Sequence, residues 1–279
     1  MASMSSSKRN YDILIFYFLL AGSIIMVYPF IWMVFTSLKP RMHIYLSGLM
    51  PRVWDVSSYV QIWTEIPLLR GFLNTLLYSV PPVVAGSLVS VGAAFALSKI
   101  RFKGHNIVFL LLLGTMMVPF PAIMIPQFVL FSGMNILQTP LPLILPKLTG
   151  NVLMIFFLRQ YMINIPDSLI EAAKLDGCNY FQIYYKIVLF LVGPALGAHG
   201  VLWFIAAWND YLAPTIFIRK EIWQPVTVMV ARFNAQYAIN THVPRIMAGS
   251  VVLLIPVLIV YGIFQRWIIE SVMISGVKE

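Results

Sequence analysis

The chain has 279 residues, of which 60% are hydrophobic and only 10% are charged, and its formal net charge is +9. A soluble domain has about 25% charged residues, so the composition excludes an ordinary soluble protein. The basic residues alternate with apolar runs and do not gather on one face, which argues against a nucleic-acid binder and suits contact with lipid headgroups. We therefore expect an all-α, polytopic membrane protein. Its single cysteine, Cys178, excludes an intrachain disulfide.

Long apolar runs predict the membrane-spanning helices, because a bilayer core of about 30 Å needs roughly 20 apolar residues in a helix. The first run follows residues 1–12 and is longer than the apolar part of a signal peptide, so we expect it to be retained. A proline-rich break divides the long charge-free stretch 106–146 into two segments. Within a transmembrane domain of residues 13–270, the predicted spans are residues 13–38, 72–98, 106–131, 141–161, 187–211 and 246–267.

The short loop from Lys99 to Lys103 indicates the orientation of these six spans. It carries three basic residues, and short basic loops next to span ends face the cytoplasm. An even number of spans places both termini on the same side. We therefore expect the N-terminus, the loop between the fourth and fifth spans and the tail of residues 271–279 to lie in the cytoplasm.

The loop between the fourth and fifth spans contains a charged island with the sequence DSLIEAAKLDGCN. Ser168 and Glu171 have the spacing of a capping box, which predicts the start of a helix. Gly177 suits the left-handed position that ends a helix, and Asn179 with Gln182 predicts a second helix start. The island is thus expected to form a short helix, a sharp turn and a second helix that leads into the fifth span.

One side of the first island helix is apolar and small. Such a helix can dock into a groove of another protein. It can equally lie on the membrane surface. The residue pattern alone leaves both possibilities open.

The island also resembles the EAA loop of the membrane subunits of bacterial ABC importers, in the stretch Glu171-Ala-Ala-Lys-Leu-Asp-Gly177 followed by Ile187 and Leu189. Two positions depart from that pattern: Phe190 replaces a usual proline, and Cys178 replaces a common alanine. Without that proline we expect a straighter entry into the fifth span. Further segments are similar to the second permease of the carbohydrate-uptake branch, such as the smaller permease of the maltose importer: Tyr28–Lys39, Asn74–Leu76, Lys99–Gly104, Trp208–Tyr211 and Ser271–Gly276.

This resemblance implies that the EAA loop, residues 166–186 here, inserts into a cleft of a cytoplasmic ATPase and transmits its motion to the membrane helices. The coupling residues that it implies are Glu171, Ala172, Ala173, Asp176 and Gly177. It also implies that the C-terminal tail contacts the ATPase pair, through Ser275, Gly276 and Lys278.

The sequence lacks the G-x-x-x-x-G-K-[ST] phosphate loop, so ATP and Mg²⁺ belong to a partner and not to this chain. We expect no catalytic residue, cofactor or metal site of its own. The resemblance implies a heterodimer with a second homologous permease, a cytoplasmic ATPase dimer and an extracytoplasmic solute-binding protein, in a bacterial plasma membrane. The implied cargo is a carbohydrate such as an oligosaccharide, with glycerol 3-phosphate or another polar solute as the alternative.

Five residues near the end of the fifth span are candidates for the substrate pathway: Trp203, Trp208, Asn209, Asp210 and Tyr211. A carboxylate at membrane depth is costly and often functional. Asp210 could instead be solvated at the interface or paired with Arg219. The aromatic rings could stack on sugar rings, or they could pack against neighbouring helices and belong to the interfacial belt.

Two other functional classes are disfavoured. A stand-alone secondary transporter usually has internal repeats and intramembrane charges, and the sequence has no convincing repeat. A membrane enzyme needs clustered polar residues within its spans. The four histidines are scattered, and only His199 lies in a predicted span.

Overall fold

The computed structural model describes the backbone of residues 2–44, 48–100, 102–239 and 242–276. Side chains are described from residue 11 to residue 267, with gaps at 45–47, 101, 237 and 240–241. All regular secondary structure in these described ranges is helical, which confirms the all-α expectation. The chain divides into two compact units, one of Met1–Pro67 with Val230–Leu254 and one of Leu68–Met229 with Ile255–Glu279.

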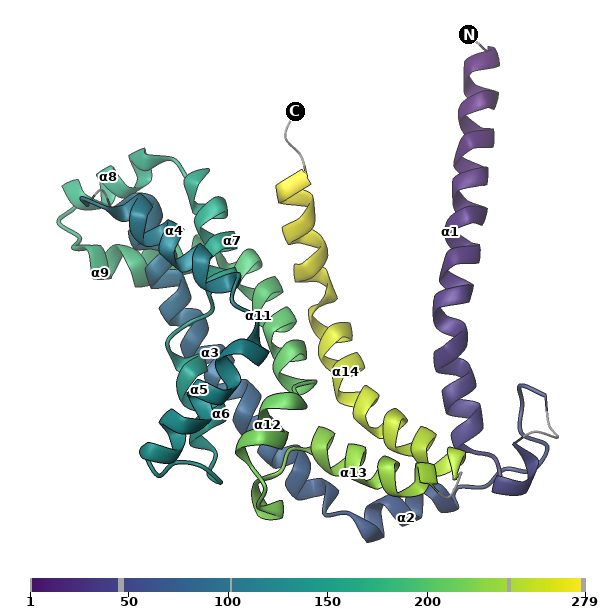
Figure 1. Ribbon diagram of the computed structural model, residues 1–279. Coiled ribbons are helices and arrows are strands. Elements are labelled where there is room, and N and C mark those ends of the chain that lie inside the picture. Colours follow the sequence, from purple (N-terminus) through teal and green to yellow (C-terminus); the bar gives the residue numbers. More distant parts are fainter. Residues whose placement is uncertain (1, 45–47, 101, 240–241, 277–279) are drawn as a thin grey trace. The chain divides into compact units, whose positions relative to one another are not determined.

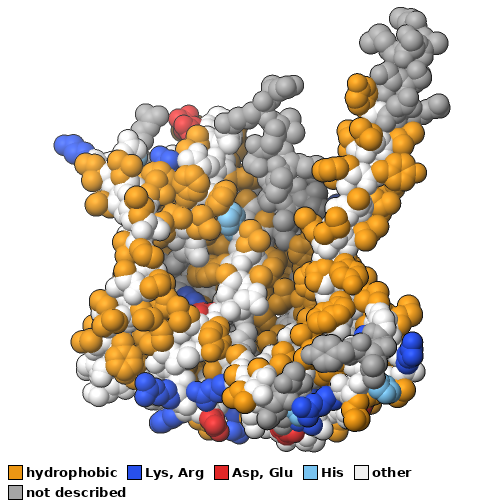
Figure 2. Space-filling view, turned by 45° about the vertical axis from the view of Figure 1, so that its right-hand side comes forward, with side chains coloured by type: hydrophobic (Ala, Val, Ile, Leu, Met, Phe, Trp, Pro, Cys, Tyr) orange, Lys and Arg blue, Asp and Glu red, His pale blue; other side chains and the backbone are white. Residues whose placement is uncertain are grey.

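The first unit begins with one long apolar helix. None of the side chains in the most apolar stretch of this helix is buried, and Figure 2 shows hydrophobic side chains along it. At its end, Ser37 and Tyr59 share a hydrogen bond of 2.6 Å, and the Lys39 ammonium donates to the Gly48 carbonyl at 2.7 Å. The helices of this unit, the last two only in part, are α1 (Ala2–Ser37), η1 (Arg41–His43), α2 (Ser57–Glu65), α13 (Val226–Ile239) and α14 (Val243–Gly276).

The second unit is built around α3 (Leu68–Lys99), which packs against α6 (Leu141–Leu148), α7 (Val152–Ile163) and α11 (Gly193–Trp208). Its core combines Val91 and Phe95 of α3 with Leu158 of α7 and Ile183 of α9 (Tyr180–Ile183), all of them buried. The other helices of this unit, labelled where possible in Figure 1, are α4 (His105–Met116), α5 (Phe120–Gly133), α6 (Leu141–Leu148), α7 (Val152–Ile163), α8 (Asp167–Leu175), α9 (Tyr180–Ile183), the π-helix η2 (Tyr184–Val188), α10 (Leu189–Leu191), α11 (Gly193–Trp208), α12 (Leu212–Phe217) and η3 (Glu221–Trp223).

Four apolar helical segments of the described chain have the length and composition of a membrane span, and the number rises to six if each of two bent helix pairs counts as one span. Four are single: Tyr11–Ser37, Leu68–Lys99, Leu141–Ile163 and Val243–Trp267. The other two are pairs of helices with a sharp bend between them. The pair α4 and α5 bends by 95°, and the pair Tyr180–Leu191 and α11 bends by 77°.

The second of these bends lies at the entry into the fifth predicted span, where a straighter entry was expected. The break falls just after Phe190, at Val192 and Gly193. Pro194 then occupies the first turn of α11, where a missing N–H costs nothing. Gly193 and Pro194 thus lie at the 77° bend where α11 begins.

Gly86 allows three helices of the second unit to approach one another closely. A Cβ atom added there would clash with the backbone carbonyl of Lys147 at the end of α6 and with the indole of Trp203 on α11. Small residues at such crossings let membrane helices pack at short range.

We expect Gly86→Ala to lower the stability of the protein, although alanine is the better helix former. Overpacking typically costs about 1–3 kcal/mol, and the carbonyl is backbone that cannot rotate away. The check is the thermal unfolding midpoint of the detergent-solubilised protein. Gly92→Ala on the same helix is the matched control, since its Cβ would meet only a Tyr184 ring carbon at 3.8 Å. Equal midpoints for the two variants would contradict the prediction.

Candidate functional site

Helix α8, the first helix of the charged island, starts two residues earlier than the predicted cap at Ser168 implies. It begins at Asp167, and its N-cap is Pro166, which makes no side-chain capping bond. Ser168 therefore lies inside the first turn, and the predicted Ser168–Glu171 capping box is wrong. The proline ring fixes φ and ends the extended segment before the helix, while Asp167 places a negative charge at the positive end of the helix dipole.

The turn after α8 has the predicted left-handed glycine. Gly177 has φ +82°. The N–H of Gly177 donates to the Lys174 carbonyl at 3.0 Å, and the N–H of Cys178 donates to the Ala173 carbonyl at 2.9 Å. These two bonds make up the Schellman motif, which satisfies carbonyls at a helix end. Cys178 is partly buried and packs against the same core as Ala173, which completes the motif with an apolar contact.

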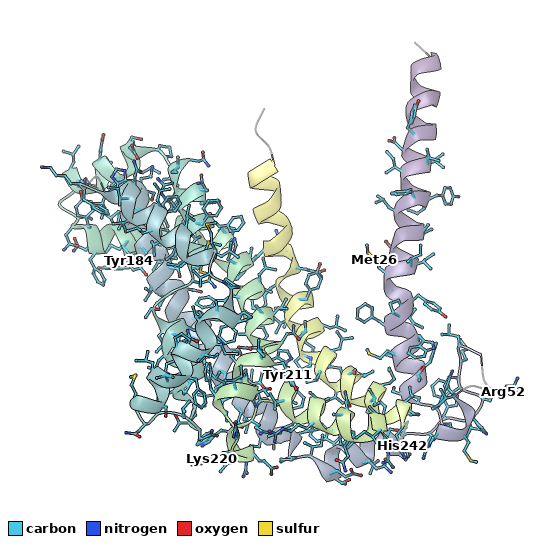
Figure 3. The ribbon with its side chains drawn as sticks, viewed as in Figure 1. Met26, Arg52, Tyr184, Tyr211, Lys220 and His242 are labelled. Carbon is cyan, nitrogen blue, oxygen red and sulfur yellow. The ribbon has the colours of Figure 1, made fainter. Side chains whose placement is uncertain are left out.

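The second helix of the island, α9, starts as predicted. The N–H of Gln182 donates to Asn179 Oδ1 at 2.9 Å, and the N–H of Asn179 donates to Gln182 Oε1 at 2.8 Å, which confirms the capping box. The helix continues as the π-helix η2, which no sequence signal predicted. Tyr184, at the start of η2, donates its hydroxyl hydrogen to the Leu88 carbonyl of α3 at 2.9 Å (Figure 3).

Helix α8 is held against the core by apolar packing and by a lysine from α3. Ile170 and Ala173 are buried in the core that α3 and α7 form. The Lys99 ammonium donates to the Ile165 carbonyl at 2.6 Å and forms an ion pair with Asp167 at 2.7 Å. The Lys99 side chain is only 6% exposed, whereas that of Asp167 is 62% exposed. Lys99 thus attaches the end of α3 to the start of α8, a role that its place in a basic loop did not reveal.

The outward face of α8 carries most of the predicted coupling residues. Glu171, Ala172, Asp176 and Gly177 are exposed, whereas Ala173 is buried and packs inside the protein. Two large apolar side chains of α8 are also exposed, Leu169 at 44% and Leu175 at 89%. The exposed surface of α8 therefore combines acidic side chains, the basic Lys174 and apolar side chains, on a helix whose other face is fixed.

The predicted tail residues lie partly outside the described part of the chain. Ser275 and Gly276 belong to the last turn of α14. Lys278 lies outside the described residues.

The five predicted pathway residues have different environments. Trp208 is 2% exposed and stacks on Phe72, with ring centroids 6.0 Å apart, so a sugar ring has no access to it in this structure. Trp203 is partly buried and packs against Gly86. Asn209 and Tyr211 are exposed at the junction of α11 and α12, where Figure 3 labels Tyr211.

Asp210 is paired with Lys147, not with the predicted alternative Arg219. The Lys147 ammonium and Asp210 Oδ2 are 3.5 Å apart, and each side chain is 24% exposed. Asp210 Oδ1 also accepts from the N–H of Ala213 at 3.3 Å, which caps the start of α12. The pair lines a cavity of about 240 Å³ together with Phe120, Gln127 and Phe217. The sequence pointed to Asp210 but gave no signal for Lys147, which lies 63 positions away along the chain.

Comparison with known proteins identifies the family. Residues 86–273 match the family described as "Binding-protein-dependent transport system inner membrane component". This chain belongs to that family. It is accordingly a permease subunit of an inner-membrane transport system and not an enzyme, as the sequence predicted.

Similar proteins match over nearly the whole length of the chain. The permease AraQ of the arabinooligosaccharides transport system of Halalkalibacterium halodurans is 32% identical, over 91% of this chain and 92% of AraQ. The inner membrane ABC transporter permease YcjP of Escherichia coli is also 32% identical, over 99% of this chain and all of YcjP. A solved chain, from a bacterial ABC transporter involved in import of the acidic polysaccharide alginate, has a TM-score of 0.78 at 27% identity, covering 93% of this chain and 97% of that chain.

Proposed function

We propose that this permease forms half of the pore of an ATP-driven carbohydrate importer and that α8 is the point where a cytoplasmic ATPase attaches. The observation that carries the proposal is the two-sided construction of α8. Ile170, Ala173 and Lys99 fix one face to the core, while Glu171 and Ala172 remain exposed. Because α8 is fixed to the core, a movement of a protein bound to its exposed face would displace the helix and the core together as a rigid body.

In the proposed topology, six spans cross a bacterial plasma membrane, and both termini and α8 lie in the cytoplasm. The bent segments α4–α5 and α9–α11 count as one span each. The basic stretch around Lys103 supports this orientation.

The proposed partners are supported by the family description, which names a binding-protein-dependent system, and for the ATPase also by the lack of a phosphate loop in the sequence. ATP and Mg²⁺ would be bound by an ATPase dimer, which would hold α8 and the tail residues Ser275, Gly276 and Lys278. A second homologous permease would complete the pore, and an extracytoplasmic binding protein would deliver the solute. One solved structure with the same fold, 15% identical and with a TM-score of 0.61, is an alginate ABC transporter in complex with an alginate pentasaccharide-bound periplasmic protein.

A carbohydrate cargo is supported by the names of several relatives. Besides the arabinooligosaccharide permease, a protein of Thermoanaerobacterium thermosulfurigenes that is 28% identical is named as a probable permease for starch degradation products. We therefore propose an oligosaccharide as the cargo of this chain.

The proposal is tested by purifying the chain from its native membrane and identifying the proteins that accompany it by mass spectrometry. We expect a second permease and an ATPase, and we expect the reconstituted complex to take up oligosaccharides only with ATP. Purification of this chain alone, with solute uptake in liposomes that needs no ATP, would instead indicate a secondary transporter. ATP-dependent uptake of glycerol 3-phosphate but of no sugar would replace the proposed cargo.

We expect Glu171→Lys to reduce the amount of co-purified ATPase at least several-fold, because Glu171 is exposed on the proposed docking face. The reversed charge would repel a basic residue in the partner's cleft. The check is the ratio of ATPase to permease after purification. Glu221→Lys on η3 makes the same charge change at an exposed residue outside the island, and it should leave that ratio unchanged. A normal ratio for Glu171→Lys would remove Glu171 from the docking face.

A further inference from the structure

We infer that the cavity beside Lys147 and Asp210 is a binding site for one neutral sugar unit, within this subunit. The inference rests on the proposed carbohydrate function and adds to it a location and a chemical class. Its walls come from α5, α6, α12 and the segment between α11 and α12, all within the second unit.

Three polar side chains give the cavity hydrogen-bonding groups for hydroxyls. The Gln127 amide lines it, and no residue of the described chain pairs with that amide. Lys147 and Asp210 face each other at 3.5 Å, which is long for a charge-assisted bond, so the ammonium keeps donors for other oxygens. An amide, an ammonium and a carboxylate together can donate to and accept from the hydroxyls of one ring.

The remaining walls and the size suit a single sugar ring. Phe120 lines the cavity and is partly exposed, whereas Phe217, which it contacts edge to face with centroids 6.5 Å apart, is only 2% exposed. The exposed surface of the Phe120 ring can pack against the C–H face of a pyranose or furanose. The volume of about 240 Å³ lies below the roughly 300–1,000 Å³ of pockets that enclose drug-sized ligands, so the cavity holds one unit of a chain and not a whole oligosaccharide.

The charge of the cavity favours a neutral unit over a uronate. Among the described lining residues, Lys147 and Asp210 carry the only formal charges, and these cancel. A uronate would bring a second carboxylate close to Asp210, and like charges repel strongly in a partly buried site. The solved structure with a TM-score of 0.78 belongs to a transporter of an acidic polysaccharide, so this distinction would separate the two importers.

Occupancy of the cavity is measured by thiol protection in the assembled importer. Cys178→Ser first removes the natural thiol, and Ala213→Cys then places one in the cavity wall while the Gln127 amide is kept. We expect neutral oligosaccharides from digests of starch and arabinan to slow its labelling by a maleimide, and an alginate digest to have no effect. Gln160→Cys in the same background is the control, because Gln160 is exposed on α7 outside the cavity and should not be protected.

Uptake by the reconstituted complex supplies the second measurement. We expect Gln127→Leu to lower the rate of neutral oligosaccharide uptake about 2–10-fold at saturating binding protein, which corresponds to one lost hydrogen bond. Asp210→Asn should shift uptake toward uronates by leaving Lys147 unpaired, and the double variant Lys147→Gln with Asp210→Asn should reverse that shift by restoring neutrality. The unfolding midpoint and the co-purified ATPase separate these effects from misfolding.

The outcomes distinguish this inference from the proposed function. Uptake of neutral sugars by the unmodified complex, without thiol protection and without an effect of Gln127→Leu, would overturn the cavity assignment alone. Protection by the alginate digest would overturn the neutral class. A complex that takes up no sugar of either kind would overturn the carbohydrate function, and the cavity assignment with it.

Discussion

Replacing Gly177 with valine should abolish ATP-dependent uptake while the chain still inserts into the membrane. Gly177 has φ +82°, a region that costs an ordinary L-residue about 1–2 kcal/mol and a β-branched residue more. A Cβ atom there would have nothing within 4 Å, so the effect comes from the backbone and not from a clash. Valine would relieve the strain by giving up the left-handed conformation, and both bonds of the Schellman motif would then break. The exposed face of α8 would lose its fixed direction.

The measurements for Gly177→Val are sugar uptake, ATPase activity and the ratio of ATPase to permease. Gly177→Asn should retain function, because asparagine tolerates the left-handed region. Gly104→Val is the matched control, since Gly104 has φ +86°, its Cβ would also meet nothing within 4 Å, and it caps α4 instead of α8. It should lower stability similarly without uncoupling the ATPase. Normal uptake by Gly177→Val would refute the coupling role of this turn.

The turn and the second capping box could be predicted because their determinants are local. Gly177 acts on bonds within five residues, and Asn179 and Gln182 bond to each other. The start of α8 was misplaced for a similar local reason, because Pro166 has a stronger effect on the backbone than the possible cap at Ser168.

The contacts between distant segments could not be predicted in this way. Lys99 and Asp167 are 68 positions apart, and Lys147 and Asp210 are 63 apart. Apolar patterns identify each helix but not its neighbours, so the sequence offered Lys99 only as a basic loop residue. The need for a glycine at position 86 could not be predicted either, because it depends on a carbonyl and an indole from two other helices.

Replacing Lys99 with methionine should loosen α8 and lower both uptake and ATPase attachment. Methionine keeps an apolar stem of similar length but removes the ammonium, which leaves the Ile165 carbonyl without its 2.6 Å donor. A hydrogen bond to a charged group contributes about 1.5–3 kcal/mol. The ion pair with Asp167 adds less, because that carboxylate is 62% exposed and screened by water. Asp167→Asn should therefore have a much smaller effect than Lys99→Met.

The size of the Lys99→Met effect depends on how often α8 leaves its docked position. An ATPase that binds only the docked form has an affinity reduced by the fraction of chains in that form. Loosening by about 2 kcal/mol could thus lower the affinity by up to roughly 30-fold. Hydrogen exchange of the α8 amides should increase together with this loss. Lys103→Met makes the same substitution at an exposed position nearby and should change neither quantity. Equal exchange and equal ATPase attachment in the two variants would show that Lys99 does not hold α8, and apolar packing of Ile170 and Ala173 would then be sufficient to fix it.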